Sequence, residues 1–186
     1  MVVKKDIRSL SIDQLKEILE ENSFQSFRAK QIYHWLWKKS SHDFSSMHNL
    51  PNKLLTFLEN NFVIRNIEIS KQQKSKDGTI KNAIKLFDDL IVECVLIPSK
   101  DRITACVSSQ VGCSLNCKFC ATARLKRMRN LNADEIYDQV VLIAKQSQDF
   151  YKRPLTNIVF MGMGEPLMNY KNVTKAIEMI TSKEGL

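Results

Sequence analysis

The spacing of apolar residues changes near residue 62, and this change constrains the fold more than any other feature of the chain. Before residue 62, leucine and isoleucine recur every three or four positions, which is typical of amphipathic helices. After it, alternating and β-branched runs predict strands at residues 79–86, 90–97 and 103–107. The pattern therefore predicts a helical first part followed by a strand-rich part.

Three helices are predicted in the first part. Ser11 and Gln14 have the spacing of a capping box before the first helix. A second helix is expected over residues 24–39, and Pro51 suits the first turn of a third. We therefore expect residues 1–62 to form a small helical domain.

Strands and helices alternate in the last third of the chain. Asn132 is predicted to cap a helix, residues 157–161 form a short apolar run, and a further helical pattern follows a glycine-rich turn. This order is typical of a parallel α/β sheet or barrel, although the units are too few to close a barrel. We predict an α/β fold with a helical domain (1–62), a β-strand extension (63–98) and the first βα units of a barrel (99–186).

The charge of the chain narrows its possible partners. The formal net charge is +8, and the stretch from Lys118 to Arg129 holds five basic residues and no acidic one. The electrostatic field of such a positively charged chain attracts RNA or DNA. An equally good interpretation is a basic enzyme whose charge only aids solubility. No apolar run is long enough to cross a bilayer, and the first residues do not resemble a secretory signal. These features predict a cytoplasmic protein without a membrane partner.

Three of the five cysteines, Cys113, Cys117 and Cys120, lie within eight residues in the order Cys-x3-Cys-x2-Cys. An odd number of cysteines, crowded into one part of the chain, argues against a disulfide framework. Thiolates ligate iron–sulfur clusters, and three of them would leave one iron of a [4Fe–4S] cluster open, as a catalytic zinc site keeps one open position. A zinc site would have to recruit Cys94 or Cys106, because no histidine follows His48. Three unrelated buried thiols are the remaining alternative, and we favour the cluster.

This motif resembles the signature of the radical S-adenosylmethionine superfamily. The segments 105–113, 117–123 and 160–167 around it resemble the bacterial adenine-methylating RNA enzymes of that superfamily. Members that methylate adenine carbon-2 in 23S rRNA and tRNA are the most similar, and members that methylate carbon-8 share much of the pattern. The resemblance implies a [4Fe–4S] cluster and S-adenosylmethionine as cofactors, and 23S rRNA and tRNA as substrates. It also implies a flavodoxin-like reductase as electron donor and a monomeric protein.

The resemblance also implies roles for single residues. Cys113, Cys117 and Cys120 would hold the cluster, whose electron would split S-adenosylmethionine to a 5′-deoxyadenosyl radical. Gly164 and Glu165 would bind the methionine amine of that cofactor. Without the resemblance, we would assign Gly164 and Glu165 to an ordinary strand-to-helix turn with a solvated carboxylate.

Two further positions carry implied catalytic roles. Glu93 shares a strand face with apolar residues, where a carboxylate is costly unless it is paired, and the resemblance makes it the proton acceptor. The alternative is an edge-strand carboxylate that reaches solvent. The resemblance makes Cys106 the thiol that forms a transient disulfide with a methyl-carrying cysteine and so resolves a protein–RNA crosslink. The alternative is a buried core thiol, which is also our prediction for Cys94.

The chain departs from the resemblance after Cys120, because no further cysteine follows. We therefore interpret it as an N-terminal fragment without the methyl-carrying cysteine and the later barrel strands, and predict that it does not turn over alone. A non-catalytic electron-transfer or zinc-containing RNA-binding protein is the competing reading. Candidate phosphate contacts are the basic residues after the cysteines and four on the second helix: Arg124, Lys126, Arg127, Arg129, Arg28, Lys30, Lys38 and Lys39.

Overall fold

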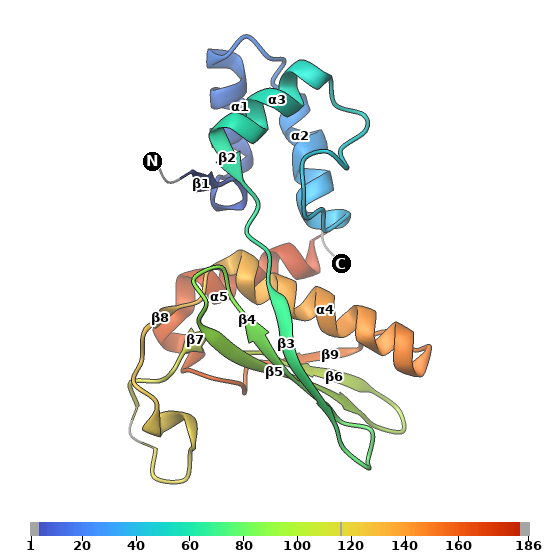
Figure 1. Ribbon diagram of the computed structural model, residues 1–186, viewed down its shortest axis with the longest axis vertical. Coiled ribbons are helices and arrows are strands. Elements are labelled where there is room, and N and C mark those ends of the chain that lie inside the picture. The colour runs from blue at the N-terminus through green and yellow to red at the C-terminus, as the bar shows by residue number, and fades with distance from the viewer. Residues whose placement is uncertain (1–3, 116, 183–186) are drawn as a thin grey trace. The chain divides into compact units, whose positions relative to one another are not determined.

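The computed structural model describes residues 4–115 and 117–182 (Figure 1). Two compact units make up the chain. The first comprises the described residues up to Arg65 together with those from Met179, and the second comprises Asn66–Glu178.

The first unit is largely helical. Its elements are β1 (Lys5–Asp6), a 3-10 turn (Ile7–Ser9), α1 (Ile12–Glu21), α2 (Arg28–Tyr33), a π-helical turn (His34–Lys38), α3 (Asn52–Asn61) and β2 (Phe62–Val63). The predicted capping box is confirmed, because the Ser11 hydroxyl accepts the Gln14 N–H and the Gln14 side chain accepts the Ser11 N–H. β1 and β2 pair in parallel.

The second helix is shorter than the sequence suggested. Ser23 has a positive φ of 62°, and the next residues form turns in which Arg28 N–H donates to the Gln25 carbonyl. The regular helix therefore begins at Arg28 rather than at residue 24. Trp37 is 1 % exposed and lies in the core, whereas the half-buried Trp35 donates its indole N–H to Asn49 Oδ1 at 2.6 Å.

A five-stranded sheet forms the second unit. Its strand order is β3 (Glu68–Lys74), β4 (Ile80–Lys85), β5 (Ile91–Pro98), β6 (Ile103–Cys106) and β9 (Asn157–Val159). The first four strands are antiparallel, and β9 pairs with β6 in parallel after the crossover through α4 (Ala133–Tyr151). Two short strands, β7 (Gln110–Val111) and β8 (Arg129–Asn130), pair beside it, and α5 (Tyr170–Thr181) follows β9.

These elements confirm the predicted α/β class. Every residue of β3 is exposed, so this strand has no apolar alternation from which it could be predicted. Strands β3, β4 and β5 of the predicted β-strand extension (63–98) share one sheet with β6 and β9 of the predicted barrel region (99–186). The sheet therefore continues across residue 98 without a structural break.

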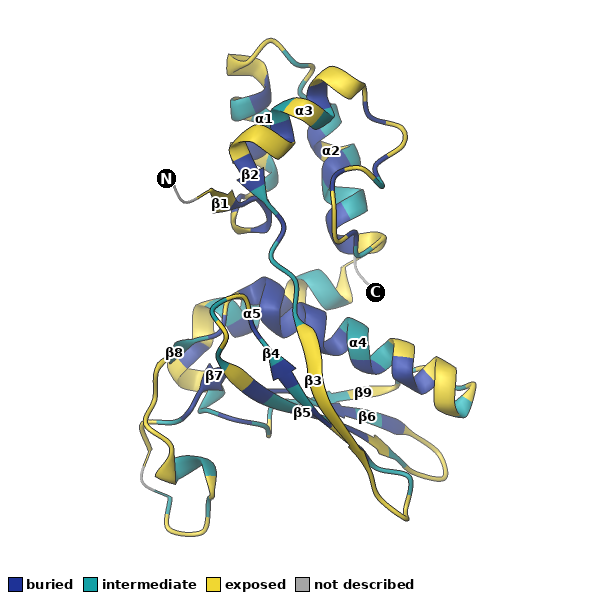
Figure 2. Ribbon diagram, viewed as in Figure 1, coloured by how far each residue is buried: buried dark blue, intermediate teal, exposed yellow. Residues whose placement is uncertain are grey.

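The two faces of the sheet differ (Figure 2). Residues of β4, β5 and β6 alternate between buried and less buried, and the buried face packs against α4. There Asn82 and Gln146 exchange two amide hydrogen bonds of 2.9 Å each. The opposite face, which carries Glu93 and Cys106, stays partly exposed.

In the part of the chain that the structure describes, no helix is both long and apolar enough to cross a membrane.

Candidate functional site

A cavity of about 250 Å³ opens on the partly exposed face of the sheet. It is lined by Lys81, Glu93, Val95, Cys106, Cys120, Thr122, Met161, Gly162 and Met163. The cavity therefore brings together Glu93, Cys106, one of the three clustered cysteines and the start of the glycine-rich turn.

Strand register explains why these side chains meet. Lys81 on β4 pairs with Val95 on β5, Val95 pairs with Cys106 on β6, and Cys106 pairs with Val159 on β9. Paired residues project from the same face of a sheet, and Glu93 joins that face because it lies two positions from Val95.

Glu93 has a partner that the sequence reading did not identify. Lys81 Nζ lies 2.7 Å from Glu93 Oε1, and both side chains are about half exposed (50 % and 45 %). The carboxylate therefore lies beside apolar neighbours as expected, but it is compensated by an ammonium group on the adjacent strand. The sequence showed only two opposite charges on two predicted strands. Because the register of those strands was unknown, the ion pair could not be predicted.

The environments of Cys106 and Cys94 differ because they project from opposite faces. Cys94 is fully buried beneath α4, and burial raises the pKa of its thiol to about 12. The predicted core position of Cys94 is thus confirmed. Cys106 is half buried, and burial raises the pKa of its thiol while a bond from the Met161 backbone lowers it. All five cysteines are free.

The three clustered cysteines lie on the segment between β7 and β8, which extends away from the sheet (Figure 1). Each is partly exposed. The Ala123 and Thr122 N–H groups lower the pKa of the Cys120 thiol, and Cys113 Sγ accepts the Leu115 N–H at 3.4 Å. Within residues 4–115 and 117–182, no three His, Cys, Asp or Glu side chains converge on one metal position.

The donor set fits an iron–sulfur cluster in its chemistry. The ligating form of cysteine is the thiolate, and the segment offers three accessible thiols, one with a lowered pKa. A cluster would require the segment to draw its sulfur atoms together, as metal sites commonly do on binding.

The glycine-rich turn packs against the strand after β6. Gly164 has a φ of +93°, and a Cβ atom there would lie 2.4 Å from Gln110 Cβ. Glycine is thus required at this position by the protein's own packing. Glu165 Oε1 accepts the Leu167 N–H at 3.0 Å, so the carboxylate caps the 3-10 turn Pro166–Asn169.

The sequence-based interpretation missed a buried polar segment, Ser108–Ser109–Gln110, whose residues are at most 1 % exposed. Ser108 Oγ donates to the Glu93 carbonyl at 2.6 Å and accepts the Met163 N–H at 2.8 Å. This hydroxyl therefore links the strand of Glu93 to the glycine-rich turn. The only sign of this buried segment in the sequence was a run of three polar residues directly after a predicted apolar strand.

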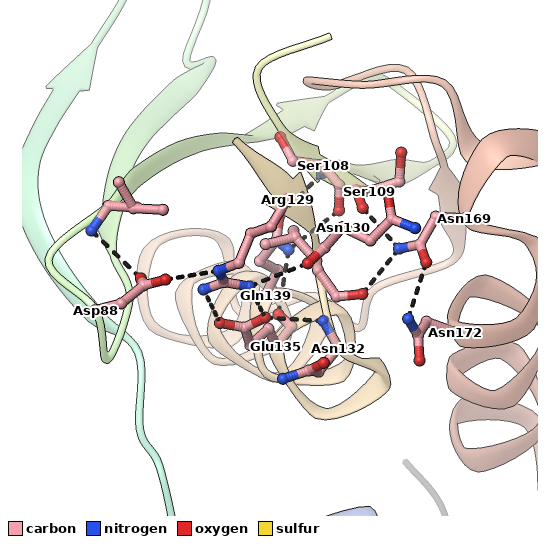
Figure 3. Close-up of polar contacts among 12 residues, drawn as sticks. Asp88, Ser108, Ser109, Arg129, Asn130, Asn132, Glu135, Gln139, Asn169 and Asn172 are labelled. Atoms are coloured by element: carbon pink, nitrogen blue, oxygen red, sulfur yellow. Dashed lines mark hydrogen bonds and ion pairs between the residues drawn. The ribbon is translucent and has the colours of Figure 1, made fainter. Parts of the chain in front are cut away.

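Arg129 does not serve as a free phosphate contact, contrary to our reading of the basic run (Figure 3). Its guanidinium donates to both Glu135 carboxylate oxygens at 2.8 Å and to Asp88 at 2.6 Å. These bonds hold β8 to α4 and to the turn after β4. Arg124, Lys126 and Arg127 of the same run are exposed.

The candidate phosphate contacts of the first unit also include one residue with partners inside the protein and others that are exposed. Arg28 donates to the Gln31 side chain at 2.7 Å and stacks on the Phe27 ring. Lys30, Lys38 and Lys39 are exposed and remain available for contact.

Two families match the chain. Residues 5–64 match the ribosomal RNA large subunit methyltransferase N-terminal domain (RlmN), and residues 107–185 match the radical SAM superfamily. The chain is 61 % identical to the probable dual-specificity RNA methyltransferase RlmN of Christiangramia forsetii, with 98 % of this chain and 52 % of the relative covered. It is 45 % identical to the dual-specificity RNA methyltransferase RlmN of Campylobacter jejuni, with 94 % and 52 % covered.

A solved structure agrees with these matches. The fold superposes on that of a radical SAM methyltransferase from Sphaerobacter thermophilus with a TM-score of 0.83 and 36 % identity. The alignment covers 97 % of this chain and 53 % of that chain. The chain thus spans about half the length of the relatives it matches.

Proposed function

Because this chain carries the RlmN N-terminal domain followed by a radical SAM segment, we propose that it acts in methylation of adenine carbon-2 in 23S rRNA and tRNA. The observation that carries the proposal is the shared cavity. Glu93, Cys106, Cys120 and Gly162 at the start of the glycine-rich turn, which are distant in sequence, line one space of about 250 Å³.

Cys113, Cys117 and Cys120 would hold a [4Fe–4S] cluster, and Gly164 with Glu165 would bind the amine of S-adenosylmethionine. When bound, the cluster and this cofactor would supply one-electron chemistry at the site. The Glu165 carboxylate is already oriented by the Leu167 N–H, and a fixed carboxylate is a suitable acceptor for an ammonium group.

Glu93 would accept the proton that leaves the methylated adenine. Its carboxylate reaches the cavity from β5 and is held by Lys81, so it is oriented before substrate arrives. Cys106 would resolve the link between protein and RNA. Its thiol lines the same cavity and takes part in no disulfide.

RNA would approach through the exposed basic residues Arg124, Lys126 and Arg127 near the cavity and Lys30, Lys38 and Lys39 in the first unit. Lysine and arginine bind phosphates without reading sequence, so these contacts would position the RNA. A flavodoxin-like reductase would supply electrons to a monomeric, cytoplasmic enzyme.

Cluster binding is tested by anaerobic reconstitution of the 186-residue chain with iron and sulfide. We expect about four irons per chain and a paramagnetic resonance spectrum that changes on adding S-adenosylmethionine. Cys117→Ala should lose the iron, and Cys94→Ala is the matched control that should keep it. A wild-type chain that binds zinc but forms no reducible cluster would contradict the proposal.

Turnover is tested separately on rRNA and tRNA transcripts. The reconstituted chain should not methylate either, because no cysteine follows Cys120 to carry the methyl group. Formation of 2-methyladenine would refute that expectation, and 8-methyladenine would also refute the carbon-2 assignment.

A further inference from the structure

Gln110 is a fully buried side chain whose two ends bond to different parts of the site. Its Oε1 accepts the Glu165 N–H at 3.0 Å, and its Nε2 donates to Asn130 Oδ1 at 2.8 Å. Glu165 belongs to the glycine-rich turn, whereas Asn130 lies on β8 just after the cysteine-bearing segment. A buried amide with both ends bonded has one defined orientation.

The backbone of Gln110 adds to this link. The Ser109 and Gln110 N–H groups both donate to the Met163 carbonyl, at 2.9 and 3.2 Å. Gly164 packs so closely on the Gln110 side chain that a Cβ atom there would lie within 2.4 Å of it. The glycine-rich turn therefore rests directly on Gln110.

Gln110 also stands at the base of the cysteine-bearing segment. It begins β7, it pairs in register with Asn130 on β8, and Cys113 follows three residues later. Asn130 in turn donates to the Met168 carbonyl at 3.3 Å, beyond the glycine-rich turn. The Gln110–Asn130 pair thus touches both segments that the site requires.

We propose that Gln110 is a positioning residue that fixes the Gly164–Glu165 turn relative to the cysteine-bearing segment. The cofactor part of this inference rests on the proposed function, in which the methionine end of S-adenosylmethionine would bind the cluster while its amine also contacts the Gly164–Glu165 turn. Both contacts form at once only if the two segments are held at a set separation, and such preorganisation increases affinity.

The alternative is that Gln110 only fills the core. Gln146 provides the comparison, because it is another buried glutamine with paired amide bonds, to Asn82 on the far face of the sheet. Gln110→Met and Gln146→Met remove comparable bonds, but only the first lies between the two segments. A purely structural role predicts similar effects of both changes.

Hydrogen exchange measured by mass spectrometry tests the positioning without any cofactor. In Gln110→Met the Glu165 amide loses its acceptor, and we expect its exchange to accelerate about tenfold. Gln146→Met should leave that amide unchanged. Gln110→Glu keeps an acceptor oxygen and should retain most of the protection, even though a buried carboxylate lowers global stability.

Reconstituted protein tests the consequence for the cofactor. Gln110→Met should bind iron like wild type, because the three cysteines are unchanged, while the S-adenosylmethionine concentration for half of the resonance change rises about tenfold. Asn130→Ala, which breaks only one end of the link, should give a smaller rise. Gln110→Glu should restore the wild-type response to within about threefold.

The inference is overturned if Glu165 exchange is the same in Gln110→Met and wild type, or if Gln146→Met accelerates it equally. If Gln110→Met does not fold, the S-adenosylmethionine response of Asn130→Ala decides the matter, and a response equal to that of the wild type overturns the inference. A wild-type protein that shows no response to S-adenosylmethionine would contradict the proposed function, whereas the exchange measurement would still decide the positioning role.

Discussion

The reactivity of the cysteine thiols in this protein depends on the surroundings of each one. Cys94 lies under α4 without solvent, Cys106 lies half buried in the cavity, and Cys120 is accessible beside backbone N–H donors. Thiolate is the reactive form of cysteine, so burial suppresses reactivity while N–H donors promote it. The same residue type therefore serves as core, as candidate reactive group and as candidate ligand.

Alkylation of the metal-free protein should follow the order Cys120, then Cys106, then Cys94. The pKa of Cys94, raised to about 12, lowers its thiolate fraction about a thousandfold relative to an ordinary thiol. The measurement is peptide mapping after iodoacetamide treatment at pH 7.5. In urea the three rates should become similar, and equal rates in the folded protein would contradict the assignment.

Arg129→Met should destabilise the protein by about 2–3 kcal/mol, because it leaves the Glu135 carboxylate buried and unpaired. That side chain is 3 % exposed. Urea unfolding measures the change, with Arg124→Met as control at about 0.5 kcal/mol or less because Arg124 is exposed. A similar loss in both variants would show that Arg129 is not the structural centre of this network.

At the scale of elements, the turn after β4 is tied to β8 and α4 through one arginine (Figure 3). The hydrogen bond from Arg129 is the main reason that the pKa of Asp88 is lowered. A lowered pKa in the folded state contributes stability while the group is ionised. The contact between these elements should therefore depend on pH.

The stability contributed by Asp88 should be fully present above pH of about 4 and lost as the pH falls through its lower pKa in the folded protein. Asp88→Asn removes this contribution. The free energies of unfolding of wild type and variant should differ constantly between pH 5 and 8 (chosen as roughly neutral conditions) and approach each other below about pH 4. A difference that does not shrink in acid would contradict the prediction.

The cysteine-bearing segment between β7 and β8 should resist proteolysis more strongly when iron binds. Its thiols do not converge in the described structure, and Phe119 is 95 % exposed. Metal ligation closes such segments, so reconstitution should slow tryptic cleavage after Lys118 and Arg124. Cleavage after Lys145 on α4 is the internal control and should stay unchanged.

At the scale of the whole molecule, charge favours a polyanionic substrate. The chain carries a net charge of +8, and exposed basic residues occur in both units. In the second unit, the run after the cysteines follows directly from the segment that lines the cavity. Phosphate contacts there would place RNA beside the proposed chemistry.

RNA affinity should fall with salt, and the slope of log K against log salt should decrease by about one for each phosphate contact removed. Arg124→Gln and Lys126→Gln test the run by filter binding of a tRNA transcript. Lys145→Gln, on α4 and away from the cavity face, is the control. Equal slopes in all three variants would exclude the run from the interface.

Local patterns predicted much of this fold because they depend on neighbouring residues. The capping box at Ser11 and the strands beginning at Ile80, Ile91 and Ile103 follow from side-chain chemistry and periodicity. β3 escaped prediction because its pairing with β4 involves backbone groups and leaves its side chains in solvent. The start of α2 was predicted too early for a similar reason, since backbone turns after Ser23 delay the helix to Arg28.

The sequence by itself determined which residues are candidates for chemistry, because the spacing of three thiols and a Gly-Glu-Pro turn can be recognised without coordinates. Tertiary structure alone decided which groups meet: Lys81 with Glu93, Arg129 with Asp88, and Gln110 with both Glu165 and Asn130. These contacts depend on strand register and on the crossover through α4, which pair residues far apart in the chain. A one-residue slip in register would turn each side chain to the other face, so no local pattern contains that information.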